Sequence, residues 1–314
     1  MAKKLAFIFP GQGSQQLGML RELAEQSALV TALFQEASEI LGYDLWHITQ
    51  HDIEKLNQTE YTQPALLTAE IALWQCWKDR RGTTPTVLAG HSLGEFSALV
   101  CAGALSFRDA VKLVANRGRY MQQAVKPGQG AMAAILGLED TQVESLCKEA
   151  KDMGIVSPAN FNSIGQVVVA GETVAVNYVI ELAKTAGAKL AKIIPVSVPS
   201  HCLLMQPAAE QLARDLASIE IKTPQIPVIH NADVESHQTP EAIKQALIIQ
   251  LTHSVRWVET IQSMIKEGVK NFIECGPGKV LAGLNKRIDA AIITESIHSP
   301  ETLEQAVQQV EENA

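Results

Sequence analysis

The sequence predicts an α/β protein with two lobes, and three observations lead to this fold class. Short apolar runs typical of buried strands alternate with helical segments, which favours a parallel sheet covered by helices on both faces. The middle of the chain changes to a βαββαβ order. The length of 314 residues exceeds what one compact core usually contains. We therefore expect a large α/β lobe with a smaller unit inserted in it.

The large lobe is predicted to begin with a buried strand. Its apolar run at 5–9 ends in Pro-Gly-Gln-Gly at 10–13, a turn that leads into a helical stretch. The turn lacks the third glycine of a dinucleotide fingerprint, because Gln16 occupies that position. Further strands are predicted at 87–89, 226–231 and 271–275, and helices at 64–78, 107–125 and 205–218. Strands separated by helices in this way give a parallel sheet.

A second unit begins after the loop-rich segment at 126–130, which reads Lys-Pro-Gly-Gln-Gly. Strands are predicted at 131–136, 155–160, 166–170 and 189–196, and helices at 141–151 and 173–186. This βαββαβ order is the ferredoxin-like pattern. We expect residues 127–198 to form this subdomain within a core made of residues 1–126 and 199–314. The cleft between the two lobes is the expected binding site.

The composition excludes several classes of partner and compartment. The formal net charge is -8, with basic residues mixed among acidic ones, so neither nucleic acid nor a membrane is an expected partner. The five cysteines are widely spaced and form no C-x-x-C pair, which argues against a disulfide framework and predicts a reducing cytoplasm. The apolar run before Pro10 is too short for a signal peptide or a membrane span.

Residues 90–94 read Gly-His-Ser-Leu-Gly, a G-x-S-x-G pentapeptide between an apolar run and a helical stretch. This context predicts a nucleophile elbow, in which a sharp turn exposes the Ser92 hydroxyl and the flanking glycines avoid a clash. The start of the helix directs the Leu93 backbone N–H toward the site, where it can bind an oxyanion. An ordinary turn is the alternative, but the strand and helix around the pentapeptide favour catalysis.

A serine nucleophile needs a base, and His201 is the best placed of the eight histidines. It follows the last strand of the insert, where the chain re-enters the large lobe, so it should lie at the cleft. A satisfied histidine at a domain junction is the alternative. His91 adjoins the serine but is expected to point away from the elbow. His47 and His51 are four residues apart, yet no H-E-x-x-H motif surrounds them and no metal site is expected.

Arg117 is predicted to lie at the flank of the buried face of a helix. Ser106 is the expected N-cap and Asp109 an acid in the first turn, which sets the phase of that helix. At about 100° per residue, Arg117 then falls only about 60° from Val114 in the apolar stripe. An arginine there requires an anionic partner, either a buried structural acid or a substrate carboxylate that the guanidinium binds with two hydrogen bonds.

Two other polar segments are candidates for binding, and a third, at 276–279, is not predicted to bind a nucleotide. The Gln12 backbone N–H can provide a second oxyanion donor, unless its segment is a simple tight turn. Asn160 and Asn162 end a strand of the small lobe, where their amides can bind a substrate or stabilise a hairpin turn. The Gly-Pro-Gly-Lys segment at 276–279 lacks the spacing of a nucleotide-binding Walker A loop.

In their order along the chain, these segments resemble those of malonyl-CoA:acyl carrier protein transacylases, acyltransferases of bacterial type II fatty acid synthesis. The resemblance covers nearly the whole chain and rests on the motifs at 11–15, 90–95, 117–118, 160–162, 198–201, 250–251 and 276–279. It implies a hydrolase-like α/β core with the inserted subdomain. It also implies a ping-pong transfer of a malonyl group from malonyl-CoA, through an ester of Ser92, to the phosphopantetheine thiol of an acidic acyl carrier protein.

The resemblance also assigns roles to individual residues. Ser92 is the expected nucleophile, His201 the base, and Gln250 the residue that orients His201 through its backbone carbonyl. The backbone N–H groups of Gln12 and Leu93 are expected to form the oxyanion hole. The expected substrate-binding residues are Arg117 for the malonyl carboxylate, and Met121, Asn160, Asn162, Gln166 and Arg287. No permanently bound cofactor is expected, and coenzyme A enters only as part of the thioester substrate.

Two departures from the family pattern bear on these expectations. Ser254 stands where relatives usually have proline, which should loosen the turn after Gln250, and Leu190 occupies a position that is often basic in relatives. The coenzyme A phosphates are then expected to contact Lys189 or Lys192, with Arg287 as a further contact. A basic patch is expected to receive the acyl carrier protein, formed by Lys279, Lys286 and Arg287.

Other functions are alternatives at this point. A serine thioesterase or other hydrolase would use water as acceptor and would need a third-member carboxylate rather than Arg117. A polyketide-pathway acyltransferase would keep the chemistry and change the acyl group. A non-catalytic carrier-binding module would retain its function after Ser92→Ala. With a backbone carbonyl in place of the triad carboxylate, we expect slow transfer to water and ready transfer to a thiol.

Overall fold

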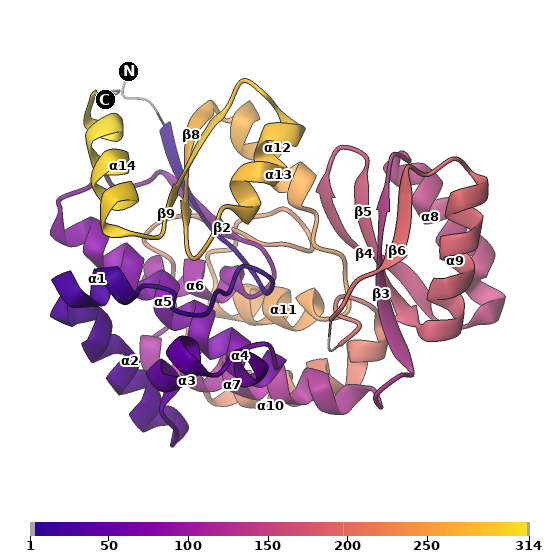
Figure 1. Cartoon of the computed structure of the whole chain (residues 1–314), viewed down its shortest axis with the longest axis horizontal. Helices are drawn as coiled ribbons and strands as arrows, with labels where there is room; N and C mark the ends of the chain where they lie inside the picture. The colour runs from indigo at the N-terminus through magenta and orange to yellow at the C-terminus, as the bar shows by residue number, and fades with distance from the viewer. Residues whose placement is uncertain (1–3, 197, 313–314) are drawn as a thin grey trace.

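The computed structural model describes residues 4–196 and 198–312. A large lobe contains a five-stranded sheet and a small lobe a four-stranded one (Figure 1). The predicted fold class is confirmed, because the large sheet is parallel and flanked by helices and the small sheet is antiparallel. The lobe boundaries at 126/127 and 198/199 stay a prediction. Residues 1–3, 197 and 313–314 fall within the predicted lobes but lie outside the described residues.

The strands of the large sheet lie in the order β7, β2, β1, β8, β9, and each paired strand is parallel to its neighbour. Their bounds are β1 Lys4–Phe9, β2 Val87–Gly90, β7 Val228–Ile229, β8 Val269–Cys275 and β9 Ile293–Ile297. The helices that precede the small lobe are α1 Arg21–Gln26, α2 Ala28–Leu41, α3 Leu45–His51, α4 Ile53–Leu56, α5 Thr59–Asp79, α6 Gly94–Cys101 and α7 Phe107–Ala124. Those that follow it are α10 Gln206–Ser218, α11 Pro240–Gln250, α12 Trp257–Lys266, α13 Val280–Ile288 and α14 Pro300–Glu312, with a 3-10 turn at Leu203–Met205.

The central strand β1 is apolar because helices cover both of its faces. On one face Phe7 packs edge-on against Trp74 and Trp77 of α5. On the other, Ile8 shares a cluster with Trp257 of α12. The alternation of side chains along a strand thus divides one continuous apolar run between two cores.

The small lobe has the predicted βαββαβ order. Its elements are β3 Gly130–Leu136, α8 Asp140–Glu149, β4 Val156–Ser163, β5 Gln166–Glu172, α9 Thr173–Thr185 and β6 Leu190–Ile193, with a 3-10 turn at Ala150–Met153. The strands lie in the order β4, β5, β3, β6 and all their pairings are antiparallel. One face of this sheet packs on α8 and α9. From the other face, Met132 and Val168 pack with Cys202 of the large lobe, so the chain leaves the insert directly beneath this sheet.

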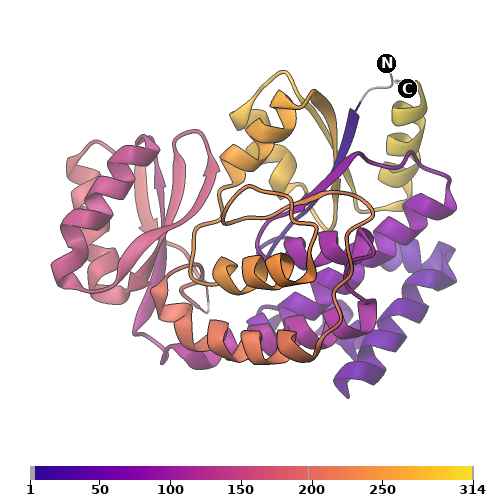
Figure 2. The same cartoon turned by 180° about the vertical axis from the view of Figure 1, so that it is seen from behind.

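Backbone hydrogen bonds join the two lobes between β4 and the loop that follows α11. Val255 N donates to Ala159 O, and Phe161 N donates to Val255 O, both at 2.9 Å. The Ser254 hydroxyl also donates to Pro158 O at 2.6 Å. Proline could not form this inter-lobe hydrogen bond, and the expectation that Ser254 loosens the turn stays a prediction. Seen from behind, α10 and α11 lie side by side below this loop (Figure 2).

Several predicted elements differ in extent from the structure, among them the strand expected at 189–196, which is β6 Leu190–Ile193. The strand expected at 226–231 pairs only at Val228–Ile229, because Pro227 has no N–H to donate and the two residues after Ile229 bond elsewhere. The helix expected at 64–78 begins at Thr59, so Pro64 lies inside it. Tight packing accounts for that early start, since Gly118 of α7 lies directly against the Thr59 backbone. Strand β9 and helices α2 to α4 were not among the predicted elements.

We predict that Gly94→Ala destabilises the protein by about 2 kcal/mol or more. A Cβ at this position would lie 2.1 Å from Phe9 O of the adjacent strand, and neither backbone has room to move. Gly283 in α13 is the matched control, because a Cβ there has nothing within 4 Å. Gly283→Ala should stabilise the helix by about 0.5–1 kcal/mol. Urea unfolding measures both, and a Gly94→Ala protein as stable as wild type would contradict the prediction.

Candidate active site

Ser92 lies at a sharp turn between β2 and α6, as the pentapeptide predicts. Its φ of 52° is in the left-handed region, which a side chain other than glycine rarely adopts. The glycines on both sides are required, because a Cβ at Gly90 would lie 1.8 Å from Gly94 C and a Cβ at Gly94 would meet β1. This strained turn lifts the Ser92 hydroxyl out of the backbone at the start of a helix.

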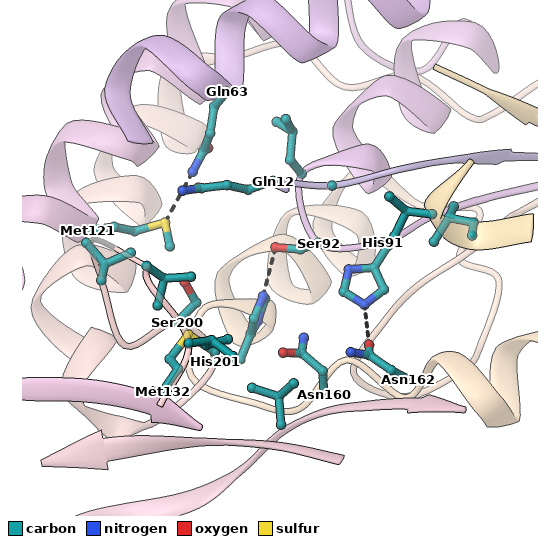
Figure 3. A pocket seen from close by; sticks show the side chains of 18 of the residues that line it. Gln12, Gln63, His91, Ser92, Met121, Met132, Asn160, Asn162, Ser200 and His201 are labelled. Atoms are coloured by element: carbon teal, nitrogen blue, oxygen red, sulfur yellow. Dashed lines mark hydrogen bonds between the residues drawn. The ribbon is translucent and has the colours of Figure 1, made fainter. Parts of the chain in front are cut away.

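His201 lies directly against the serine (Figure 3). Its Nε2 is 2.7 Å from Ser92 Oγ, and its Nδ1 is 2.7 Å from the backbone oxygen of Gln250. The carbonyl can only accept, so Nδ1 carries the proton and Nε2 is free to accept one from the serine. Burial, and then the charge of Arg117, lower the pKa of His201 to about 3, although the Gln250 hydrogen bond raises it. The imidazole is therefore neutral and able to act as a base.

Arg117 points from α7 toward the same hydroxyl. The side chain is 1% exposed and donates to Gln63 Oε1 at 2.9 Å, to Gln250 Oε1 at 2.9 Å and to Ser92 Oγ at 3.2 Å. Within residues 4–196 and 198–312 no carboxylate lies at ion-pair distance from it. Burial lowers the pKa of Arg117 to about 10, so the guanidinium stays charged at neutral pH. Of the two partners expected for it, a structural acid in direct contact is excluded.

A cavity of about 190 Å³ opens beside Ser92 and His201 between the two lobes. It is comparable in size to a cavity of roughly 150 Å³ that holds one benzene molecule. The predicted residues that line it are Gln12, Ser92, Leu93, Arg117, Met121, Asn160, Asn162 and His201. Among the described residues, the backbone N–H groups of Gln12 and Leu93 have no hydrogen-bond acceptor, so both remain available to a ligand.

Three of the predicted residues are placed differently from the expectation. His91 does not point away, since its ring lines the cavity and its Nε2 lies 2.8 Å from Asn162 Oδ1 (Figure 3). Gln166 and Arg287 are not among the residues that line the cavity. Arg287 donates to Gln166 Oε1 at 2.7 Å on the surface. The rings of His47 and His51 on α3 lie 5.0 Å apart between centroids and are tilted by 44° to each other, and the described residues hold no cluster of three metal-ligating side chains.

Several polar residues around the serine are not predicted from the sequence. Gln63 holds Arg117 from α5, and Glu95 and Asn231 contact the backbone or side chains of the site residues. Two signals were present in the sequence. Glu95 follows the pentapeptide immediately on an otherwise apolar helix, and Asn231 ends an apolar run that was predicted to be a strand. A polar residue in such a place is buried only if it is hydrogen-bonded.

The described residues include no helix that is both long and apolar enough to cross a membrane.

We predict that stability falls as the pH drops below about 6.5, in part because of His201. The unfolded chain binds a proton on this imidazole near its usual pKa of about 6.5, whereas the folded chain does so only near 3. Between pH 7 and pH 5 the wild type should therefore lose about 2 kcal/mol more than His201→Gln, which has no such proton to bind. Urea unfolding of both proteins at the two pH values tests this, and parallel losses would contradict it.

Comparisons with known proteins agree with this geometry. Residues 6–306 match the acyl transferase domain family. The malonyl CoA-acyl carrier protein transacylase of Escherichia coli (strain K12) is 50% identical over 306 residues, which is 97% of this chain and 99% of the relative. The solved malonyl CoA-acyl carrier protein transacylase of Coxiella burnetii is 53% identical, with a TM-score of 0.97 over 99% of this chain and 98% of that one.

A further solved structure shows a malonyl-transacylase in complex with a type II PKS acyl-carrier protein. It is 49% identical to this chain, with a TM-score of 0.96 over 98% of this chain and 100% of that one. These likenesses extend over the sequence and the fold of nearly the whole chain. The chain belongs to the acyl transferase domain family, as its resemblance to malonyl-CoA:acyl carrier protein transacylases indicates.

Proposed function

We propose that this protein transfers the malonyl group of malonyl-CoA to the phosphopantetheine thiol of an acyl carrier protein in fatty acid biosynthesis. The observation that carries the proposal is a charged guanidinium that lies 3.2 Å from a serine hydroxyl and has no carboxylate partner among the residues that the structure describes. The same hydroxyl is hydrogen-bonded to a neutral histidine. A nucleophile and a carboxylate-binding group thus share one cavity. The names of the relatives, malonyl-transacylases, support the same substrate.

In the first half-reaction Ser92 attacks the thioester carbonyl of malonyl-CoA. His201 Nε2 takes the hydroxyl proton as the C–O bond forms, since it already lies 2.7 Å from Oγ. The negative charge that develops on the thioester oxygen is bound by the backbone N–H groups of Gln12 and Leu93. Collapse of this intermediate breaks the C–S bond, and the coenzyme A thiol leaves with the proton from His201. Ser92 then carries the malonyl group as an ester.

In the second half-reaction the carrier thiol replaces coenzyme A. His201 removes its proton, the thiolate sulfur attacks the malonyl ester, and the proton returns to Ser92 as the C–O bond breaks. His201 is oriented here by the Gln250 carbonyl, which carries no full charge. An imidazolium is then less stabilised than beside a triad carboxylate, so the site is suited to an acceptor that is easily deprotonated. A thiol is such an acceptor and water is not.

Arg117 selects the acyl group in this proposal. The guanidinium can bind the free carboxylate of a malonyl group with two parallel hydrogen bonds, exchanging its contact with Ser92 Oγ for the substrate. Met121, Asn160 and Asn162 border the same space. The volume of the cavity suits an acyl group of a few non-hydrogen atoms better than a long chain.

Basic residues outside the cavity are the proposed contacts of the larger parts of both substrates. Lys279, Lys286 and Arg287 are exposed on or next to α13, a helix that also contributes Leu281 and Leu284 to the cavity. We propose this patch as the docking site of the acidic carrier, and the exposed Lys189 and Lys192, together with Arg287 and its partner Gln166, as the contacts of the coenzyme A phosphates. The free thiols of all five cysteines support a reducing cytoplasm as the compartment.

Two alternatives differ in the acceptor or in the acyl group. A transferase of a polyketide pathway is favoured by one observation, the likeness to a malonyl-transacylase bound to a type II PKS acyl-carrier protein. It shares every chemical step above and differs in the acyl group that it transfers and in its carrier. A thioesterase is less well supported, because the histidine contacts a backbone carbonyl rather than a carboxylate and because a hydrolase does not need Arg117.

We predict that intact wild-type protein gains the mass of one malonyl group on incubation with malonyl-CoA, and that Ser92→Ala gains none. Arg117→Ala should be labelled by malonyl-CoA at least about tenfold more slowly, because charged hydrogen bonds to the carboxylate are lost. Its labelling by acetyl-CoA, which has no carboxylate, should change much less. Arg119→Ala on the same helix is exposed and serves as the control. Malonyl labelling that Arg117→Ala leaves unchanged would contradict the role of Arg117.

We also predict that the isolated malonyl-enzyme loses its acyl group slowly in buffer and rapidly when a thiol-bearing carrier protein is added. The reason is the carbonyl that replaces a carboxylate behind His201. Time-resolved mass spectrometry of the acyl-enzyme measures both rates. Rapid loss in buffer alone would favour the hydrolase alternative.

A further inference from the structure

Glu95 is a fully buried carboxylate that the transfer steps above leave without a role. It lies on α6, three residues after Ser92, and its relative exposure is 0%. Burying a carboxylate is unfavourable by several kcal/mol unless hydrogen bonds and opposite charges compensate it. The contacts of Glu95 therefore indicate what it does in the fold.

Three donors from two other segments face the two oxygens of Glu95. His230 Nδ1 lies 2.6 Å from Oε1, while Oε2 accepts from Asn231 N at 3.0 Å and from Gln250 Nε2 at 2.8 Å. An ionised carboxylate accepts from all three, whereas the neutral acid would have to donate at one of its oxygens. Burial alone lowers the pKa of His230, but the Glu95 carboxylate more than offsets this and raises that pKa above its usual value.

The Gln250 side chain connects this carboxylate to Arg117. Its Nε2 donates to Glu95 Oε2 at 2.8 Å and to Ser92 O at 2.9 Å, and its Oε1 accepts from Arg117 Nη2 at 2.9 Å. An anion at the nitrogen end and a cation at the oxygen end allow only one orientation of the amide. The backbone oxygen of the same residue accepts from His201. Whatever holds Gln250 therefore positions both Arg117 and His201.

A second connection runs from Glu95 to the backbone of the elbow. The Asn231 backbone N–H is bound to Glu95, and the Asn231 side chain accepts from Ser92 N at 2.7 Å and donates to Gly90 O at 2.6 Å. These two bonds support a serine whose φ is 52°. A single residue, Gln250 or Asn231, thus links the Glu95 carboxylate to each of the three groups: the nucleophile Ser92, the base His201 and the carboxylate-binding Arg117.

We propose that Glu95 is a positioning residue that determines acyl-group specificity, because it fixes the Gln250 amide so that Arg117 presents its guanidinium to the substrate carboxylate. The inference rests on the proposed malonyl transfer. The positioning effect of Glu95 differs from a through-space effect of its charge, because removing the charge and losing the orientation change the attraction of Arg117 for a carboxylate in opposite directions. Removing a buried anion would by itself strengthen the attraction of Arg117 for a substrate carboxylate. Loss of the Arg117 orientation weakens this attraction instead.

Glu95→Gln is the first test. The amide introduced carries no negative charge and has one acceptor oxygen where the carboxylate has two, so the charge-assisted hydrogen bond that orients the Gln250 amide is lost. We expect the ratio of kcat/KM for acylation by malonyl-CoA to that by acetyl-CoA to fall about tenfold or more. Glu70→Gln is the matched control. Glu70 is also 0% exposed, but burial raises its pKa well above the usual value and it contacts neither Gln250 nor Arg117.

Two outcomes for Glu95→Gln would overturn the proposal. An unchanged ratio would show that the carboxylate does not act on Arg117, and if both thioesters lose activity equally, its role is merely structural. A ratio that rises would show that charge, not orientation, is the dominant effect.

Gln250→Met provides a second, independent measurement, because it removes the amide while keeping the backbone carbonyl that orients His201. The ratio should fall as it does in Glu95→Gln, and the double variant should lose no more than Gln250→Met alone, since the two act through one amide. If Glu95→Gln does not fold, an unchanged ratio in Gln250→Met still overturns the proposal. Wild type that takes no malonyl group would instead overturn the proposed function. Wild type that prefers malonyl, with variants that keep the preference, overturns only the role of Glu95.

Discussion

The hydrogen bond between Ser92 Oγ and His201 Nε2 is the contact on which the rest of the site depends. It joins residues 109 positions apart, and both have a positive φ, 52° for the serine and 61° for the histidine. Such a conformation persists only where the surroundings hold it. The parallel pairing of β1 with β2, the glycines of the elbow and the Gln250 carbonyl provide that support. Much of the packing of the large lobe therefore serves to keep two side chains 2.7 Å apart.

The charge of Arg117 is held without being neutralised by contact. Two neutral amide oxygens, from Gln63 and Gln250, accept hydrogen bonds from the guanidinium and keep it in place. A carboxylate in the same position would form an ion pair that a substrate would have to break, whereas an amide leaves the charge available. The nearest buried counter-charge, Glu95, lies on the far side of the Gln250 amide. This separation leaves the guanidinium available for the proposed binding of an anionic acyl group.

The two lobes divide the work of the site. The large lobe carries the proposed catalytic and carboxylate-binding residues Ser92, His201, Arg117 and Gln250, while the small lobe contributes a wall of the cavity through Met132, Asn160 and Asn162. Short backbone hydrogen bonds near Val255 and the contact of His91 with Asn162 hold the lobes together around the cavity. Because these contacts lie close to Gln250 and Ser92 in the chain, a shift of the small lobe would be felt at the catalytic groups.

The local signals in the sequence determined the fold class, the βαββαβ insert, the elbow and the N-cap at Ser106, which donates and accepts with Asp109 as expected. These depend on periodicity, turn glycines and short-range hydrogen bonds, which neighbouring residues specify by themselves. The motifs also identified Ser92, His201, Arg117 and Gln250 as a set. The distances between these four residues could not be predicted from the sequence. They depend on the packing of β2, α7 and α11 and of the segment in which the chain re-enters the large lobe after the insert.

Only the tertiary structure decided the rest. It turned the His91 ring into the cavity, extended α5 past Pro64 through packing on Gly118, and gave Ser254 an inter-lobe partner. It also brought Glu95 to residues 135 to 155 positions away. The position of a buried polar side chain depends on the hydrogen-bond donors that surround it. These donors come from segments that are far apart in the sequence, so the order of residues along the chain does not indicate their contact.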